Sequence, residues 1–413
     1  MNKAESQRIA SYLTCAGYQI GMTPQSADLI VLNTCVVRQS AEDRVLGTLG
    51  LLKGLKEKCP NLSILVTGCF VDSNVEELKK RFPQVDLFFK PGAYSGLIDW
   101  LHRTGISVAE PRICLLTPLS PCAFVPIIQG CNNFCSYCIV PHRRGREISR
   151  PAEAIVCEVE GLVRRGIKEV TLLGQNVDSY GHDPESSSGL DLADLLTRLN
   201  DVDGLVRIRF LTNHPRDMTL NLLQGMASLS KVCQHLELPV QAGDDDILKA
   251  MRRGYTGEQY RELVRTIRNY VPEISLSTDV IVGFPGEREE QFERTFSLLK
   301  EIRFDIVHVA AYSPRPGTIA WREYKDNIPL EVKKKRLNKI EELQANIAAE
   351  INSQLQDKIV EVMVEGKKRG KWYGRTRSNK LVFFEDDADR LGQLVEVKIE
   401  KTSPWALQGQ LIP

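Results

Sequence analysis

The sequence contains no apolar run that approaches the roughly 20 residues of a membrane span, and no secretory signal near its start. These absences predict a cytoplasmic protein without a membrane partner. The chain also has almost no charge excess, because its formal net charge is +1 over 413 residues. That balance excludes a uniformly basic nucleic-acid binder, so any nucleic-acid binding must be local.

A disulfide framework is a third feature that the sequence does not support. The chain has 11 cysteines, an odd number, and several lie in spacings typical of functional sites, which suits a reducing cytosol better than paired disulfides. A hydrophobic content of 42% with 26% charged residues is ordinary for a globular protein. The length predicts two or three domains.

Three cysteines form a C-x3-C-x2-C loop at Cys131, Cys135 and Cys138. Three thiolates on a short loop can hold three irons of a 4Fe–4S cluster and leave the fourth iron open to a cofactor, commonly S-adenosylmethionine when the chemistry is radical. A zinc site with His142 as fourth ligand is the alternative. The apolar run 123–128 just before the loop predicts a strand, so the loop lies where α/β barrels carry catalytic residues. We therefore predict that the loop is catalytic.

Residues 1–112 predict an open parallel α/β domain. Strand 28–34 is followed by Cys35 and a helix at 39–58, and strand 63–68 is followed by Cys69 and a helix at 75–82. Both thiols should lie at the carboxyl edge of the sheet, and their matching positions indicate a shared metal or cluster. The first predicted helix, 4–17, has no strand before it. By the pattern of the other units, a strand and a third cysteine should precede it.

Residues 117–345 alternate strands and helices, which predicts a parallel barrel of the (βα)6 type with its site at the carboxyl ends of the strands. The predicted strands are 123–129, 169–173, 206–212, 234–240, 275–283 and 305–312. Polar and glycine clusters follow or end five of them, at 174–176, 212–214, 241–243, 278–279 and 313–317. Each cluster alone is ordinary turn chemistry. Five at equivalent positions favour the lining of a site.

After a predicted helix at 331–354, residues 355–413 predict a small antiparallel β-barrel, with turns at 365–366, 378–379 and 391–392. The segment 367–380 holds seven cations and no acid. A solvated face is the ordinary explanation of such a run. The interleaved aromatic residues favour RNA instead, with phosphate contacts and base stacking. The expected RNA-binding residues are Lys367, Lys368, Arg369, Lys371, Trp372 and Tyr373.

Taken together, these motifs resemble the radical S-adenosylmethionine methylthiotransferase family over nearly the whole chain, and the C-terminal barrel resembles a TRAM domain. The segments that carry the resemblance are 32–42, 67–69, 130–147, 173–176, 278–287 and 312–318. Within the family, segments 35–44, 143–147 and 251–255 are most similar to the branch that methylthiolates isopentenyladenosine next to the tRNA anticodon. Sister branches, which modify threonylcarbamoyladenosine in tRNA or an aspartate of a ribosomal protein, remain alternatives, as does an RNA-binding iron–sulfur protein without catalysis.

The resemblance implies two 4Fe–4S clusters and S-adenosylmethionine. One cluster would be held by the three-cysteine loop, and the auxiliary one by Cys35, Cys69 and a third cysteine. In the family that third cysteine belongs to a segment ending in Cys-Gln-Met-Asn, of which only Met1-Asn2 is present here. Cys15 lies on the first predicted helix, in the wrong place to replace it. We therefore expect an N-terminally truncated chain with an incomplete auxiliary cluster.

The resemblance also implies a set of cofactor contacts and partners. The residues expected to contact S-adenosylmethionine are Gly174, Gln175, Asn176, Gln241, Thr278, Asp279, Ser313 and Arg315. The expected partners are tRNA, an electron donor such as flavodoxin or ferredoxin, and a sulfur-donating cluster assembly system. The protein is expected to be a monomer.

Overall fold

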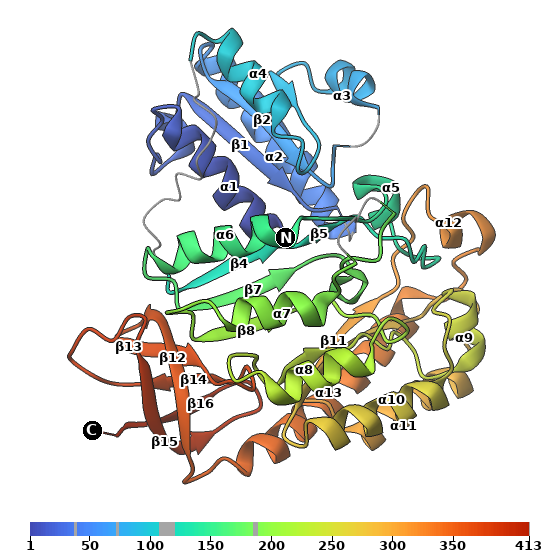
Figure 1. Cartoon of the computed structure of the whole chain (residues 1–413). Helices are drawn as coiled ribbons and strands as arrows, with labels where there is room; N and C mark the ends of the chain where they lie inside the picture. Colours follow the sequence, from blue (N-terminus) through green and yellow to red (C-terminus); the bar gives the residue numbers. More distant parts are fainter. Residues whose placement is uncertain (37–38, 72–73, 107–119, 185–188, 413) are drawn as a thin grey trace. The chain divides into compact units, whose positions relative to one another are not determined.

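The computed structural model describes residues 1–36, 39–71, 74–106, 120–184 and 189–412 (Figure 1). It divides into two compact units. One comprises Met1–Thr117, Gln129–Arg146 and Arg315–Thr318, and the other comprises Pro118–Ile128, Glu147–Pro314 and Ile319–Pro413. The predicted domain limits at 112 and 117 fall outside the described residues, so those limits stay predictions. None of the described helices is long and apolar enough to cross a membrane.

The first unit contains a parallel sheet in the order β1-β2-β3, as the strand and helix pattern predicted. Its strands are β1 (Leu29–Thr34), β2 (Ser63–Gly68) and β3 (Leu87–Phe88), and its helices are α1 (Asn2–Cys15), α2 (Gln39–Lys58), α3 (Val75–Arg81), α4 (Ser95–Arg103) and α5 (Val140–Arg144). Successive residues of β2 point to opposite faces. Ile64 and Val66 join the core cluster that contains Leu49, whereas Leu65 joins the one that contains Ile9 and Leu97. Both faces of the sheet are therefore buried. The sequence did not predict β3 or α4.

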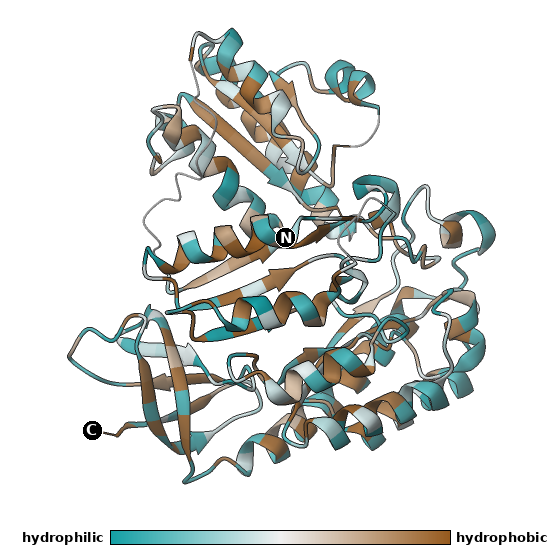
Figure 2. Ribbon diagram, in the orientation of Figure 1, coloured by the Kyte–Doolittle hydropathy of each residue, from teal (hydrophilic) through white to brown (hydrophobic). Residues whose placement is uncertain are grey.

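The second unit contains six parallel strands in chain order, which confirms the predicted partial barrel. They are β4 (Cys122–Pro126), β7 (Glu169–Leu173), β8 (Arg207–Phe210), β9 (His235–Glu237), β10 (Ser275–Val282) and β11 (Ile306–Ala311). Strands β4, β7 and β8 form one sheet and β9, β10 and β11 another, joined by a bridge between Ile208 and Val232. In Figure 2 the strands are largely hydrophobic, whereas helices α10 (Gly257–Tyr270) and α11 (Glu289–Ile302) contain many hydrophilic residues.

The remaining elements of this unit connect or cover the strands. They are β6 (Ile148–Ser149), α6 (Ala152–Val163), η2 (Val177–Ser179), α7 (Leu192–Asn200), α8 (Leu220–Ser228), α9 (Asp245–Ala250), α12 (Ile319–Glu323) and α13 (Leu330–Ser353). The two-residue strand β5 (Ile128–Gln129) pairs with β6. The predicted strand 206–212 is shorter in the structure, because Thr212 adopts a left-handed backbone with φ of 73° and cannot continue β8.

The C-terminal part of the second unit is a closed barrel in the order β12-β13-β14-β16-β15, with one parallel pair, β14 and β16. Its strands are β12 (Ile359–Lys368), β13 (Lys371–Arg375), β14 (Leu381–Phe384), β15 (Leu394–Thr402) and β16 (Leu407–Leu411). Arg369 and Gly370 join β12 to β13 with φ of 51° and 84°, as a type I′ hairpin requires. The predicted turn at 365–366 is wrong: a register shift between Val364 and Gly366 forms a bulge there, inside β12.

Candidate functional site

The three-cysteine loop closes on itself at its base. The amide of Cys131 donates to the carbonyl of Gly145 over 3.2 Å. Gly130 has a φ of 83°, and a Cβ at this position would lie 1.9 Å from the carbonyl oxygen of Arg146. Only glycine therefore permits the two ends of the loop to come this close. Within the loop, Phe134 has a left-handed φ of 47°, and its ring lies 4.4 Å from the Arg146 guanidinium carbon.

The cysteines of the loop are arranged along this constrained backbone. Cys135 is buried, Cys131 and Cys138 are half-buried, and the amide of Cys138 donates to the carbonyl of Cys135 over 3.0 Å. Among the described residues, no three His, Cys, Asp or Glu side chains converge as a single metal ion requires. A 4Fe–4S cluster carries its irons at separate corners, so the loop suits a cluster better than the zinc alternative. The ring of His142 packs edge-on against Phe134.

Cys35 and Cys69 lie at one edge of the N-terminal sheet, as predicted. Thr34 and Gly68 are register partners at the ends of β1 and β2, and each cysteine is the next residue in the chain. Gly68 has a φ of 92°, and a Cβ there would lie 2.2 Å from the carbonyl oxygen of Thr34. Cys69 is buried and Cys35 is exposed. The two thiols therefore sit at equivalent positions, which the strand pattern alone had indicated.

Arg144 joins this edge to the three-cysteine loop within the same unit. Its side chain is 4% exposed, its Nε donates to Cys69 Sγ over 3.3 Å, and its Nη2 donates to Asn2 Oδ1 over 3.1 Å. Glu5 Oε2 lies 3.6 Å from Nη2. A buried guanidinium beside Cys69 would offset the charge of a thiolate. We did not single out Arg144 from the sequence, although it lies in the basic run that follows the loop.

Cys15 lies far from this edge. Asn2, at the start of α1, donates to the carbonyl of Thr34 over 2.9 Å. Cys15 is at the other end of this 14-residue helix, about 20 Å along its axis. The structure therefore agrees that Cys15 cannot take the place of a third ligand beside Cys35 and Cys69.

Arg315, a predicted cofactor contact, is buried in the first unit against α2. Its Nη1 donates to Gln39 Oε1 over 2.8 Å and its Nη2 to Glu42 Oε2 over 2.5 Å. The structure therefore gives this guanidinium protein partners, and its contact with a cofactor stays a prediction.

In the second unit, the segment after β7 carries three predicted contacts. A Cβ on Gly174 would lie 2.4 Å from Ile128 Cγ2, so glycine allows the backbone to pack closely there. Gln175 is half-buried. Asn176 is 2% exposed, and its Nδ2 donates to Asp217 Oδ2 over 2.7 Å. The structure thus brings Asn176 into contact with the segment that follows β8.

Two non-glycine residues adopt left-handed backbones at the carboxyl ends of neighbouring strands. Thr212 follows β8 with φ of 73°, and Gln241 follows β9 with φ of 72°. Gln241 is held by its amide, which donates to Asp279 O, and by its carbonyl, which accepts from Ile281 N. Strain of this kind is typical of functional sites, where the surrounding structure enforces it.

The remaining predicted contacts differ in how their side chains are used. The Thr278 hydroxyl donates to Leu238 O and accepts from Val240 N, both over 2.9 Å. This buried hydroxyl therefore serves the backbone of the barrel. Asp279 and Ser313 are half-buried at the carboxyl-end region of β10 and after β11. Their contact with a cofactor stays a prediction.

The sequence analysis did not single out three titratable groups at this end of the barrel. Burial raises the pKa of Asp178 to about 7, although hydrogen bonds from His214 N and Asn213 Nδ2 oppose the shift. Burial lowers the pKa of His214 to about 3, so its ring is neutral. Burial and the nearby Asp279 raise the pKa of Glu237 to about 7. A charged residue inside the apolar stretch 236–240 is the signal from which Glu237 could have been found.

Several buried polar atoms at the same end have no hydrogen-bond partner within the described part of the chain. They are Asn176 Oδ1, Asn213 Oδ1 and His214 Nε2. Buried polar atoms are normally satisfied. The two open amide oxygens are therefore suited to a ligand that brings its own donors, such as an ammonium group or sugar hydroxyls. His214 Nε2 is suited to an acceptor of the ligand, because Nδ1 of the neutral ring already accepts from Arg216 N.

The predicted RNA-binding residues fall into two environments. Lys367, Lys368 and Arg369 are exposed at the hairpin between β12 and β13, and Lys371 pairs with Glu385 over 2.9 Å. Trp372 is instead 7% exposed in the barrel core. The indole donates to Asp386 O over 3.1 Å. The structure therefore removes Trp372 from the candidate interface, because consecutive strand residues face opposite sides and this one faces inward.

Tyr373, the next residue, faces the outside of the barrel and stays in the candidate RNA surface. It is half-buried, it is the register partner of Phe383, and the two rings lie 6.2 Å apart. The hairpin cations and this aromatic pair form the candidate RNA surface.

Three family descriptions match the chain. Residues 1–90 match Uncharacterized protein family UPF0004, residues 125–299 match the Radical SAM superfamily, and residues 355–412 match the TRAM domain.

Similar proteins match the chain over its whole length. A tRNA-2-methylthio-N(6)-dimethylallyladenosine synthase of Dehalococcoides mccartyi (strain CBDB1) is 52% identical over 413 residues, which cover 100% of this chain and 96% of that protein. A protein of the same name from Roseiflexus sp. (strain RS-1) is 47% identical and covers 100% of this chain and 87% of its own. Among solved structures, the radical S-adenosylmethionine methyltransferase TsrM from Kitasatospora setae superposes with a TM-score of 0.53 at 15% identity, covering 76% of this chain and 66% of that one. That likeness shows the fold.

Proposed function

Because the chain belongs to the family of the tRNA-2-methylthio-N(6)-dimethylallyladenosine synthases, we propose that it attaches a methylthio group to C2 of N(6)-dimethylallyladenosine in tRNA. The chain is a radical S-adenosylmethionine enzyme. The observation that carries the proposal is the identity of 52% across all 413 residues. The barrel fold and the C-terminal TRAM domain support it.

A 4Fe–4S cluster and S-adenosylmethionine follow from membership of the radical S-adenosylmethionine superfamily. We propose Cys131, Cys135 and Cys138 as the ligands of this cluster, because the closed base of the loop holds three thiols on one short segment. When bound, the cluster supplies the electron that cleaves S-adenosylmethionine and so makes radical chemistry at an adenine C–H bond possible. The protein's own part is to bind, to orient and to exclude water.

We assign the cofactor to the carboxyl end of the barrel. Asn176 Oδ1 and Asn213 Oδ1 offer buried acceptors to its ammonium and hydroxyl groups. The neutral His214, whose Nδ1 accepts from Arg216 N, offers an Nε2–H donor instead. Gly174 and Gln241 shape the backbone around it. The predicted contacts Gln175, Asp279 and Ser313 line the same strand ends, whereas Thr278 acts through the backbone of β9 and β10. Arg315 is the weakest candidate for a cofactor contact, because its guanidinium already donates to Gln39 and Glu42.

For the sulfur donor we propose an auxiliary 4Fe–4S cluster with Cys35 and Cys69 among its ligands. Their positions at the paired ends of β1 and β2, and Arg144 beside Cys69, support this proposal. Replacing either cysteine with Ala should leave cleavage of S-adenosylmethionine intact and abolish the methylthio product. Equal loss of both activities would contradict the separate role.

The proposed choice of a prenylated adenosine as substrate rests on chemistry as well as on sequence similarity. Burying the five carbons of a prenyl group contributes a few kcal/mol at about 0.8 kcal/mol per methylene. A threonylcarbamoyl group would bring a carboxylate that needs a paired cation in the pocket. We further propose that the enzyme works in the cytoplasm as a monomer, with a flavodoxin or ferredoxin as electron donor and a cluster assembly system to renew its sulfur.

The decisive experiment uses cells that lack their own methylthiotransferases, with and without the prenyl transferase. The chain, and a form extended upstream in its reading frame, are expressed there, and tRNA nucleosides are analysed by mass spectrometry. Methylthio product should appear only with prenylation. Product that persists without it, or that appears only on threonylcarbamoyladenosine, would overturn the proposal.

A second experiment tests the cluster ligands. The triple variant with Cys131, Cys135 and Cys138 replaced by Ala should lose about four irons per chain and all cofactor cleavage. Replacing the exposed Cys59 and Cys157, which lie outside the motif, is the matched control and should leave the iron content unchanged. A triple variant that still cleaves S-adenosylmethionine would show that these thiols are wrongly assigned.

A further inference from the structure

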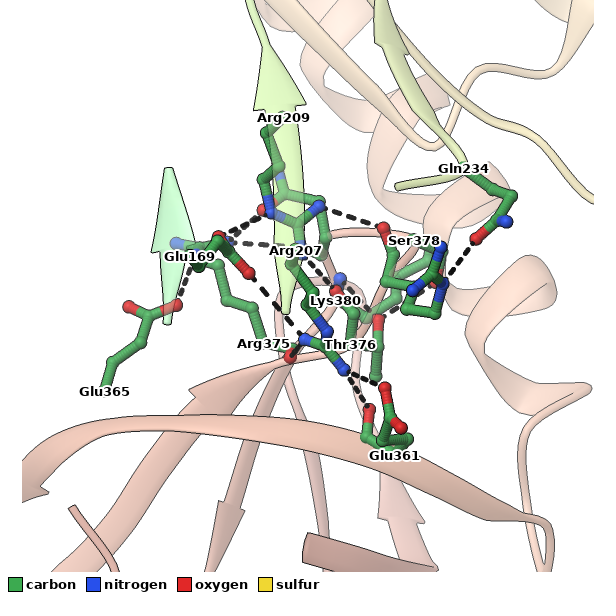
Figure 3. A network of polar contacts seen from close by, with 12 residues as sticks. Glu169, Arg207, Arg209, Gln234, Glu361, Glu365, Arg375, Thr376, Ser378 and Lys380 are labelled. Atoms are coloured by element: carbon green, nitrogen blue, oxygen red, sulfur yellow. Dashed lines mark hydrogen bonds and ion pairs between the residues drawn. The ribbon is translucent and has the colours of Figure 1, made fainter. Parts of the chain in front are cut away.

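The amino ends of β7 and β8 carry a buried charge cluster that faces the TRAM domain (Figure 3). Glu169, Arg207 and Arg209 are 3%, 0% and 5% exposed. Arg209 Nε donates to Glu169 Oε1 over 2.8 Å, and Arg207 Nη1 lies 3.8 Å from Glu169 Oε2. One carboxylate thus serves two guanidiniums. The remaining buried N–H groups need acceptors from elsewhere, because an unpaired buried charge is strongly unfavourable.

The TRAM domain supplies these acceptors. Glu361 of β12 accepts from Arg207 Nη2 over 2.5 Å, and the turn between β13 and β14 supplies the others. Arg207 Nη1 donates to the carbonyl of Arg375 over 2.7 Å. Arg209 donates to the carbonyls of Thr376 and Arg377, over 2.6 and 2.9 Å. Three successive backbone carbonyls therefore accept from the two arginines. Because these acceptors belong to the main chain, the bonds fix the path of the turn itself. Residues 375–380 are called the anchor turn below.

Side chains of the anchor turn also form hydrogen bonds and an ion pair with the barrel. Arg377 Nη2 donates to the carbonyls of Ser230 and Val232, over 2.7 and 2.6 Å, and its Nε donates to Gln234 Oε1 over 2.9 Å. Lys380 forms an ion pair with Asp305, just before β11. The anchor turn is thus bound to the segments before β9 and β11 as well as to β8.

The anchor turn and the cationic hairpin lie at opposite ends of one short strand. β13 has five residues, so it separates them by about 15 Å at roughly 3.4 Å per residue. The strand is paired on both sides within a closed barrel, which makes it stiff. A turn that is fixed at one end of β13 therefore also fixes the hairpin of Lys367, Lys368 and Arg369 at the other end.

We propose that the anchor turn positions the TRAM hairpin on the barrel, so that its cations meet the tRNA backbone at a set place relative to the catalytic barrel. Arg209 and Arg377 are then positioning residues for tRNA that touch no RNA. This inference rests on the proposed action on tRNA. It also divides the basic run: Arg377 and Lys380 bind the barrel, and only the hairpin cations bind phosphates.

The test uses the full chain with its cluster reconstituted and tRNA that carries dimethylallyladenosine. Arg377→Met should weaken tRNA binding about tenfold, because a hairpin that is no longer fixed must be ordered on binding. The log–log salt dependence should stay unchanged, since the same phosphates are still contacted. The double variant Lys367→Met, Lys368→Met should instead flatten that slope by roughly 0.7 to 0.9 for each lost contact. Arg198→Met, which breaks only an exposed pair with Glu153, is the matched control.

Turnover and backbone exchange separate positioning from general damage. In Arg377→Met, the KM for tRNA should rise about tenfold, kcat at saturating tRNA should stay within about twofold, and the KM for S-adenosylmethionine should not change. Amide hydrogen exchange in β13 and β14 should become faster. Lys380→Met, which removes a single ion pair, should show the same pattern more weakly and serves if Arg377→Met does not fold.

Three results would overturn the inference. A flatter salt slope in Arg377→Met would mean that Arg377 itself contacts phosphate. Unchanged tRNA affinity with faster exchange would mean that the anchor does not position the hairpin. Unchanged exchange would mean that these bonds do not hold the turn. If the unaltered protein failed to bind tRNA, the proposed function would fail, whereas the exchange experiment would still report on the anchor.

Discussion

The two ends of the barrel bury polar groups in opposite ways. At the amino end, Arg207 and Arg209 share Glu169 and donate further to carbonyls and to the Glu361 carboxylate of the TRAM domain. Arg207 Nε has no hydrogen-bond partner among the described residues. At the carboxyl end, Asn176 and Asn213 each use their amide N–H groups on a carboxylate but leave the oxygen unbonded within the described part of the chain. The guanidiniums at the amino end are paired with carboxylates, whereas two amide oxygens stay open at the carboxyl end.

The two patterns suit different roles for the two ends. Buried charges that the protein itself pairs are costly to disturb, so the amino end holds two domains together. Buried acceptors that the protein leaves open lower its own stability and are retained where a ligand satisfies them.

The largest effect should come from the amino end. Arg209→Met leaves Glu169 without its closest partner and frees two carbonyls, so it should destabilise the folded protein by about 3 to 5 kcal/mol. Denaturation of the apo protein measures this. The control Arg198→Met, at an exposed pair, should cost about 1 kcal/mol or less. An equal loss of stability in the two variants would mean that the buried charge cluster is no more important to the fold than an exposed ion pair.

At the carboxyl end, the same kind of change should affect the ligand more than the fold. Asn176→Ala removes the bond to Asp217, at a cost of about 1 kcal/mol. It should weaken S-adenosylmethionine binding about tenfold or more, because an open acceptor is lost. Asn221→Ala, which also removes an asparagine–aspartate bond but at an exposed site, should leave cofactor binding unchanged. An unaltered cofactor affinity in Asn176→Ala would refute the assignment, and equilibrium binding measures both.

The pH dependence of stability sharpens the comparison further. Burial and Asp279 raise the pKa of Glu237 to about 7 from its usual 4.5, so the unfolded chain releases this proton first as pH rises. The contribution of Glu237 to stability is therefore complete below about pH 4 and is lost as pH rises through about 7. Glu237→Gln keeps an acceptor for Thr212 N but does not titrate.

The Gln variant should therefore gain stability relative to the unaltered protein between pH 5 and pH 8, on the order of 2 kcal/mol. Denaturation midpoints across this range test it, with the exposed Glu273→Gln as control. A constant difference between the two proteins would mean that Glu237 ionises normally.

The smallest effect should come from a single hairpin cation. Lys368→Met removes an exposed charge that has no ion-pair partner among the described residues. It should weaken binding alike across tRNAs and flatten the log–log salt slope by roughly 0.7 to 0.9. An unchanged slope would mean that Lys368 is an ordinary solvated residue and does not contact phosphate.

Much of the fold follows from local pattern. Strand β2 and helix α2 begin and end where the sequence predicted them, since apolar runs and amphipathic spacing are local properties. The matching positions of Cys35 and Cys69 also followed, because a residue after a parallel strand must lie at that edge of the sheet. Short elements such as β3 and β6 gave no comparable signal, since two residues carry no period.

The candidate site was predicted only in part. The cysteine spacing and the polar clusters pointed to the candidate site, because one such cluster is ordinary turn chemistry but five at equivalent strand ends favour a site lining. The missed groups Asp178 and His214 depend on each other, through a hydrogen bond between segments that are 36 residues apart. Their shifted pKa values arise from burial, which the chain acquires only on folding.

The reactive and charged groups of this protein could be identified from its sequence: three thiols on one loop, two more after matching strands, and a run of seven cations in the last domain. How the run of cations is used depends on contacts that form only when the chain folds. Lys368 reaches solvent, Arg377 reaches the barrel, and Trp372 between them enters the core. The physical reason is that the role of a charge depends on what lies opposite it, and that neighbour comes from a distant part of the chain.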